Sequence, residues 1–167
     1  IVLTLLMFMI FACGNNHKPG MADAGTDSLP SDLTGITGKI NADPKNAELY
    51  NQRALLYLEK NDPDKALKDI NKAITINPEN SLYLRTLSDI FFATGKIKNC
   101  EDALKKACEI NPDDAEAVLK LAELSFYMKD YKKTFEYTDK AQKMDKLNAR
   151  ADFIRGMVHK DMGDTAK

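Results

Sequence analysis

Asn77-Pro78-Glu79-Asn80-Ser81 is the stretch that decides the fold, because its pattern returns at a fixed interval. Proline ends the preceding helix and holds the residue before it out of the α region. The Asx residue two places after the proline can cap the next helix by accepting a hydrogen bond from a free backbone N–H. The stretch therefore predicts a boundary between helical hairpins. Stretches of the same form stand 34 positions earlier and 34 and 68 positions later, the last one without its proline: Asp43-Pro44-Lys45-Asn46-Ala47, Asn111-Pro112-Asp113-Asp114-Ala115 and Asp145-Lys146-Leu147-Asn148-Ala149.

Charge and cysteine content exclude several classes of protein. The 167 residues carry a net charge of −1, with acids and bases interspersed, so the chain lacks the basic stripe of a nucleic-acid-binding protein. Cys13, Cys100 and Cys108 are too few and too scattered for a disulfide framework. Cys100 and Cys108 fall on one predicted helix about 12 Å apart along its axis, which is too far for a bond between them. We interpret both as small core or half-buried side chains.

The first residues have the pattern of an export signal. Residues 1–12 form an apolar run that is shorter than the ~20 residues of a membrane-spanning helix and fits the hydrophobic part of a secretory signal. Ile10-Phe11-Ala12-Cys13 then resembles a bacterial lipobox, although Phe11 is bulky for its place. The resemblance implies cleavage before Cys13 and lipidation of this cysteine; a plain signal peptide or a buried helix is the alternative. Residues 13–30, rich in Gly, Pro, Ser and Asp, are predicted to be a flexible tether.

The boundary stretches divide the rest of the chain into units of 34 residues. We predict an N-terminal capping helix over residues 31–46, and helical hairpins over 47–80, 81–114 and 115–148, followed by part of a fourth over 149–167. Within the hairpins, Asp62-Pro63 predicts the start of a second helix and Gly95 the end of a first one.

Both ends of the sequence carry an expectation. Without a basic segment or an initiator Met before the apolar run, we expect the sequence to begin inside its gene. The first helix of the fourth unit carries Phe153, Ile154, Met157 and Val158. Since a repeat cannot bury its apolar face alone, we expect the native chain to continue beyond Lys167 with a helix that covers this face.

Residues 31–167 resemble the tetratricopeptide repeat (TPR) family, whose units are 34 residues long. Arg53, Ser125, Cys100 and Thr134 depart from the family pattern. The resemblance implies an all-α fold, an α-solenoid of antiparallel helical hairpins that forms a TPR superhelix. The family's position for a large residue is filled by Tyr50, Leu84 and Val118, and its position for a small residue by Ala54, Ser88, Ala122 and Gly156. Its aromatic position is filled by Tyr57 and Phe91, and the alanine position of the second helix by Ala73, Ala107 and Ala141.

The resemblance also implies a binding function. Members of this family are scaffolds whose first helices line a concave groove for an extended or helical peptide. The ladder Leu58, Phe92 and Phe126, spaced by 34, either anchors a partner segment or packs against neighbouring helices. Carried over residue by residue, the predicted groove consists of Glu48, Asn51, Leu55, Leu58, Leu82, Arg85, Asp89, Phe92, Leu119, Glu123, Phe126 and Tyr127.

Other binding sites and enzyme activity are not expected. Asn51 and Leu55 stand where chaperone-binding members carry a Lys and an Asn that grip a C-terminal carboxylate. His17 and His159 have no second ligand at metal spacing, so no metal is expected. No phosphate loop, serine elbow or Cys/His pairing is present, so we expect no cofactor and no catalytic residue.

The sequence thus favours a lipid-anchored adaptor that binds a protein or peptide at the bacterial cell envelope. Gly14, not Asp, follows Cys13, which by the sorting habit of enterobacteria favours the outer membrane. The alternatives are a component of a glycan-binding outer-membrane lipoprotein, and a purely structural spacer.

Replacing Cys13 by Ala should abolish the incorporation of a fatty-acid analogue, because the lipobox makes the thiol of Cys13 the acceptor. Metabolic labelling of the wild-type chain and of Cys13→Ala in bacterial cells measures this, with Gly14→Ala as a control that keeps the label. Label that persists in Cys13→Ala contradicts the assignment.

Overall fold

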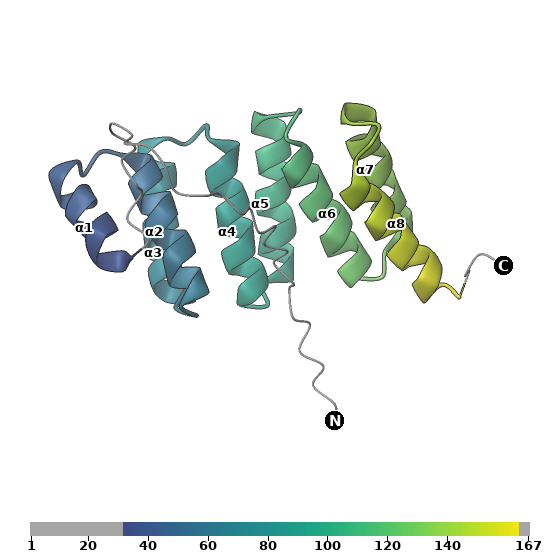
Figure 1. Cartoon of the computed structure of the whole chain (residues 1–167), viewed down its shortest axis with the longest axis horizontal. Coiled ribbons are helices and arrows are strands. Elements are labelled where there is room, and N and C mark those ends of the chain that lie inside the picture. The colour runs from purple at the N-terminus through teal and green to yellow at the C-terminus, as the bar shows by residue number, and fades with distance from the viewer. Residues whose placement is uncertain (1–31, 164–167) are drawn as a thin grey trace, which may run out of the picture.

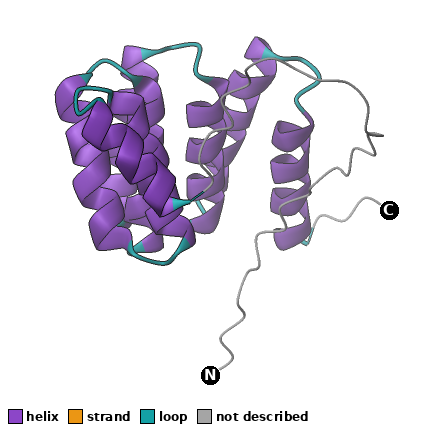
Figure 2. Cartoon of the chain, turned by 60° about the vertical axis from the view of Figure 1, so that its left-hand side comes forward, coloured by secondary structure: helices purple, strands orange, loops and turns teal. Residues whose placement is uncertain are grey.

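The computed structural model describes residues 32–163. Residues 1–31, with the predicted signal segment, Cys13 and the predicted tether, and residues 164–167 lie outside the described part. Within residues 32–163 all regular secondary structure is helical (Figure 2), which confirms the all-α prediction. The helices are α1 (Leu33–Ala42), α2 (Ala47–Glu59), α3 (Pro63–Ile76), α4 (Ser81–Ala93), α5 (Ile97–Ile110), α6 (Ala115–Tyr127), α7 (Tyr131–Met144) and α8 (Ala149–Asp161).

The helices stack side by side in chain order from α1 at one end to α8 at the other (Figure 1). The most extensive helix–helix contacts are those within the three hairpins, which pair α2 with α3, α4 with α5 and α6 with α7. The second helix of each hairpin also packs against the first helix of the next unit. α1 packs against α2 in the same manner. The predicted α-solenoid is therefore confirmed.

One layer of the stack is concave. One layer contains α2, α4, α6 and α8, and within it α2 packs on α4 and α6 packs on α8. The other layer contains α1, α3, α5 and α7, and within residues 32–163 no two of its helices make a contact of that size. Helices on the inside of a curved stack lie closer together than those on the outside. The first helices of the repeats are therefore the inner layer, and their exposed side is the concave face.

The boundary stretches act as the sequence predicts, with one exception. The side chains of Asn80, Asp114 and Asn148 accept hydrogen bonds from the backbone N–H groups of Leu82, Ala117 and Ala151, at 3.0, 3.0 and 2.9 Å. Asn46 makes no such bond. Its side chain is exposed, where water can satisfy the free donors of the first turn.

The turn inside each hairpin uses a left-handed residue at one fixed position. Asn61, Gly95, Lys129 and Gly163 follow one another at intervals of 34 and have φ of 56°, 70°, 60° and 76°. Each stands just past the C-cap of a first helix, where this conformation lets the backbone satisfy the last carbonyl groups. Lys129 adopts it although a side chain makes it unfavourable.

The core is a series of small clusters that link neighbouring repeats. The second-helix alanines Ala73, Ala107 and Ala141 are all 0% exposed, as expected where helices approach closely. One cluster joins α1 to α4, a second joins α6, α7 and α8, and two smaller ones join α5 to α6 and α4 to α6. The partly buried Cys108 packs against three of these clusters.

The apolar residues of α8 differ from expectation. Ile154 and Val158 are 0% exposed and therefore face the preceding repeat, so the prediction that they await a following helix is wrong. Because successive helical residues point about 100° apart, Phe153 lies on another side and is 66% exposed, while Met157 is partly buried against the α6–α8 cluster. Asp152, Gly156 and His159 form an exposed stripe on α8.

A buried ion pair replaces an apolar pair in the first repeat. Arg53 donates to both oxygens of Asp69, from Nε to Oδ2 at 2.6 Å and from Nη2 to Oδ1 at 2.8 Å, and from Nη1 to Thr37 Oγ1 at 3.2 Å. The side chains are only 16% and 6% exposed, and the hydrogen bond with Asp69 raises the pKa of Arg53. In the second repeat the same two places hold Leu87 and Ala103.

Replacing Lys129 by Gly should stabilise the fold by roughly 0.5–1 kcal/mol, because Gly adopts φ of 60° without the steric penalty but loses more entropy on folding. Chemical denaturation of both chains measures the change. The same substitution at Lys140, inside α7, should instead destabilise by ~1 kcal/mol. A loss of stability in both variants contradicts the expectation.

Replacing Asp69 by Ala should cost about 3 kcal/mol, because the half-buried guanidinium of Arg53 is left without its partner. Adding Arg53→Leu recreates the Leu87 and Ala103 pair, so the double variant should return to within about 1 kcal/mol of the wild type. Denaturation of the single and double variants completes the cycle. Additive losses would show that the two side chains are independent.

Candidate protein-binding face

Large apolar side chains remain exposed on the inner layer. Leu55 on α2 and Phe92 on α4 are both 39% exposed, Tyr127 on α6 is 63% exposed, and Met128 directly after it is 39% exposed. The rings of Phe92 and Tyr127 meet edge to face, with centroids 5.4 Å apart. We call Phe92 and Tyr127 the aromatic pair. It bridges α4 and α6 on the concave face.

The other apolar residues predicted for the groove are less accessible. Leu58 and Leu82 are half-buried and pack against the α1–α4 cluster. Phe126 is half-buried beside the ring of Tyr131, with centroids 6.4 Å apart. Leu119 is 5% exposed and belongs to the α6–α8 cluster. In the ladder of Leu58, Phe92 and Phe126, Phe92 is therefore the most exposed side chain.

Asn51 is also buried, at 1% exposure. Its Oδ1 accepts no hydrogen bond within residues 32–163. Such a group costs free energy, and the structure shows no compensation for it.

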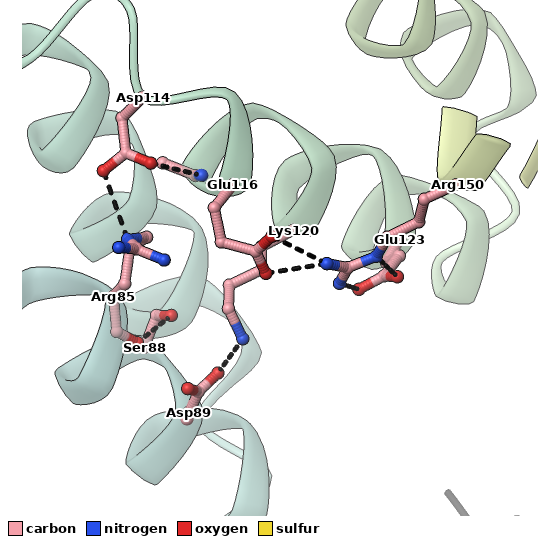
Figure 3. A network of polar contacts seen from close by, with 9 residues as sticks. Arg85, Ser88, Asp89, Asp114, Glu116, Lys120, Glu123 and Arg150 are labelled. Carbon is pink, nitrogen blue, oxygen red and sulfur yellow. Dashed lines mark hydrogen bonds and ion pairs between the residues drawn. The ribbon is translucent and has the colours of Figure 1, made fainter. Parts of the chain in front are cut away.

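Three of the polar residues predicted for the groove, Arg85, Asp89 and Glu123, belong to a network that crosses the inner layer (Figure 3). A fourth, Glu48, lies outside this network and accepts a hydrogen bond from Gln52 at 3.2 Å. Lys120 donates to Asp89 at 2.6 Å, which ties α6 to α4. Arg85 Nε lies 3.1 Å from Asp114 Oδ2 in an ion pair without hydrogen-bond geometry at that nitrogen. Asp114 also caps α6 through Ala117 N, so one carboxylate fixes both a helix start and a neighbouring repeat.

Arg150 of α8 completes this network. Its Nε and Nη2 donate to the two oxygens of Glu123 at 2.7 and 2.8 Å, and its Nη1 donates to both oxygens of Glu116 at 2.7 and 2.8 Å (Figure 3). The hydrogen bonds with Glu123 and Glu116 raise the pKa of Arg150. We call Arg85, Asp89, Asp114, Glu116, Lys120, Glu123 and Arg150 the inner ion-pair network.

Some members of this network were not predicted from the sequence. Glu116 and Arg150 stand 68 and 102 positions after Glu48, so extending the groove position of Glu48 through the later repeats would have found them. Phe153 likewise stands 102 positions after Asn51. The sequence does not indicate that Lys120 and Asp114 belong to the network, because its pattern predicts a helix cap at Asp114 and an exposed lysine at Lys120.

A surface hollow lies between α2 and α3, outside the predicted groove. It has a volume of about 430 Å³ and is lined mainly by Tyr50, Arg53, Lys68, Asp69 and Lys72. Arg53 and Asp69 hydrogen-bond each other there, so the hollow's most buried polar groups already have partners.

The described residues give little support for a metal-binding site or a reactive thiol. Between residues 32 and 163 no group of three or more His, Cys, Asp or Glu side chains could hold a metal ion. Cys100 is 3% exposed, and burial raises the pKa of its thiol to about 11. A protonated, covered thiol is a poor nucleophile.

Known proteins share the repeat. Models of the tetratricopeptide repeat match residues 47–80 and 86–114. Among curated proteins, the bovine (Bos taurus) BBSome complex member BBS4 is 26% identical over 160 residues, 94% of this chain and 30% of that protein. The β-barrel assembly-enhancing protease of Escherichia coli is 32% identical over 91 residues, 54% of this chain and 18% of the protease. The chain spans less than a third of either relative.

Solved structures show the same fold. MamA superposes with a TM-score of 0.67 at 21% identity, covering 78% of this chain and 77% of MamA. YrrB, described as a TPR protein with an unusual peptide-binding site, gives 0.64 at 19% identity, covering 77% and 66%. The first TPR of Spaghetti (RPAP3), bound to the HSP90 peptide SRMEEVD, gives 0.65 at 14% identity, covering 72% and 98%.

Proposed function

We propose that this chain, a tetratricopeptide repeat protein, is a scaffold that binds a segment of a partner protein on its concave face. The exposed aromatic pair carries the proposal, because exposed rings on a rigid surface are typical anchors of protein interfaces. Two of the solved neighbours are a peptide complex and a protein described by its peptide-binding site, which supports binding of the same kind.

The inner layer suits this task because it is rigid before a partner arrives. The inner ion-pair network ties α4, α6 and α8 together at distances of 2.6 to 3.1 Å. A preorganised surface loses less conformational entropy on binding. The role we propose is binding rather than catalysis, since the thiol of Cys100 is covered and Asp89, Glu116 and Glu123 are paired with cations of the same chain.

We further propose that the scaffold works at the bacterial envelope, anchored through a lipid on Cys13. The support lies in the sequence: the apolar run of residues 1–12, the lipobox-like residues before Cys13, and the polar segment after it. From Cys13 to Leu33 a chain fully extended spans at most about 70 Å. No helix within residues 32–163 is long and apolar enough to cross a membrane.

Capture of a glycan is the alternative. The surface hollow beside Tyr50, with Lys68 and Lys72, is the observation in its favour. Protein binding is better supported, because the hollow's Arg53 and Asp69 satisfy each other while the aromatic pair is open.

Replacing Tyr127 by a photo-crosslinking phenylalanine in the full chain should capture the partner in the native host, and the crosslinked segment can then be synthesised. Phe92→Ala and Tyr127→Ala should each weaken binding of that segment about thirtyfold, the effect of an interface anchor worth ~2 kcal/mol. Titration by fluorescence anisotropy measures this, and circular dichroism checks that both variants remain helical.

Leu147→Ala is the matched control, because Leu147 is 88% exposed but lies in the α7–α8 loop, outside the inner layer. It should bind as the wild type does. Equal affinity in all four chains, or a crosslink to a saccharide alone, would overturn the proposal.

A further inference from the structure

The charge beside the aromatic pair points to the chemistry of the partner. We propose that the concave face selects a partner segment that carries basic side chains next to apolar ones. This inference rests on the proposed function, because it specifies what binds at the same face.

The rings and the carboxylates share one surface. Phe92 follows Asp89 by three residues on α4, and Tyr127 follows Glu123 by four residues on α6. Helical residues three or four apart lie on the same face. A row of carboxylates on α4 and α6 therefore runs beside the row of rings formed by the aromatic pair.

The network beside the rings keeps an excess of negative charge. Arg85 is matched by Asp114, and the remaining cations, Lys120 and Arg150, face three carboxylates. One negative charge is therefore left without an equivalent cation in the network. Those three side chains, Asp89, Glu116 and Glu123, keep 39%, 38% and 33% of their surface exposed.

The exposed carboxylates and rings can hold an incoming cation together. A carboxylate can accept about four hydrogen bonds, and Lys120 supplies Asp89 with one. The 63% exposed ring of Tyr127 can attract a guanidinium or ammonium group through its face. An apolar side chain of the same segment can pack on Phe92, so adjacent basic and apolar residues fit adjacent rows.

The other cations near this surface do not reverse its charge. Lys129, two residues after Tyr127, lies 3.5 Å from Asp161. Lys160 on α8 is exposed but stands one repeat beyond Phe126. An acidic segment, such as the peptide SRMEEVD bound by the structural neighbour, meets like charge on α4 and α6.

Three fluorescein-labelled peptides of about ten residues test the inference, since this length covers roughly 33 Å in extended form. Each contains two Phe and two residues X among Gly and Ser, with X being Arg, Gln or Glu. The full chain should bind the Arg peptide about fivefold more tightly than the Gln peptide, and the Glu peptide most weakly. The preference should shrink as salt is raised, because exposed charges are screened.

Two charge-neutralising variants separate the local effect from net charge. Glu123→Gln should lose most of the preference for the Arg peptide, while Glu136→Gln, at an exposed site on the outer helix α7, should keep it. Asp89→Asn provides a second test that does not touch Arg150, and circular dichroism confirms the fold of each variant. Tyr127→Ala should weaken all three peptides through the lost ring, and the Arg peptide most, because that peptide also loses the attraction between the ring face and its guanidinium groups.

The outcomes separate the two proposals. Equal binding of all three peptides that is lost in Tyr127→Ala would overturn the basic preference and leave the proposed binding face intact. Tighter binding of the Glu peptide would overturn the inference as well. No binding of any peptide at about 1 mM would also overturn it, whereas the proposed function is decided separately by the crosslinked partner.

Discussion

The close contact between the two helices of each repeat is the constraint on which the rest of the structure depends. Ala54, Ala66 and Ala73 are 0% exposed in the first repeat, and Ala107 and Ala141 are 0% exposed at the places of Ala73 in the next two. Helix axes approach to about 8–10 Å according to the side chains at the contact, so these alanines set the spacing. Because each repeat contacts only its neighbours, the same hairpin packing recurs along the whole stack.

Neighbouring repeats are joined by polar side chains as well as by the core. Where the second and third repeats carry Leu87 and Leu121, the first and fourth carry Arg53 and Arg155, and both arginines reach back to the helix before them. The position is more open in the fourth repeat, since the Arg155 side chain is 32% exposed, whereas Leu121 is 2% exposed and the Arg53 side chain 16%. An arginine can cover apolar surface with its stem and keep its charged head hydrated or paired, which suits both arginine positions.

The inner ion-pair network and the aromatic pair have different roles on the concave face. Its charges mostly neutralise one another and hold α4, α6 and α8 in register, so they add rigidity. Charges already paired within the chain contribute to which partner is preferred more than to how tightly it binds. The aromatic pair, which bridges two repeats without a charge, is left as the part of the surface that can bury apolar area.

The sequence by itself determined the helices, their boundaries and the repeat. Proline and Asx caps act within a few positions of the chain, so their effects can be predicted locally, with Asn46 as the exception. Among the left-handed turn residues Gly95 was predicted as a helix end, whereas the conformation of Asn61 and Lys129 was found only in the structure. The tertiary structure alone decided which groove residues remain open. Asn51 and Leu119 occupy groove positions by register yet are buried, while Phe92 and Tyr127 are open. Arg85, Asp89 and Glu123 form ion pairs with Asp114, Lys120 and Arg150, which come from the N-cap of α6, from α6 and from α8. Burial and ion pairing between repeats depend on how closely helices from different repeats approach each other, and no local sequence pattern encodes that approach.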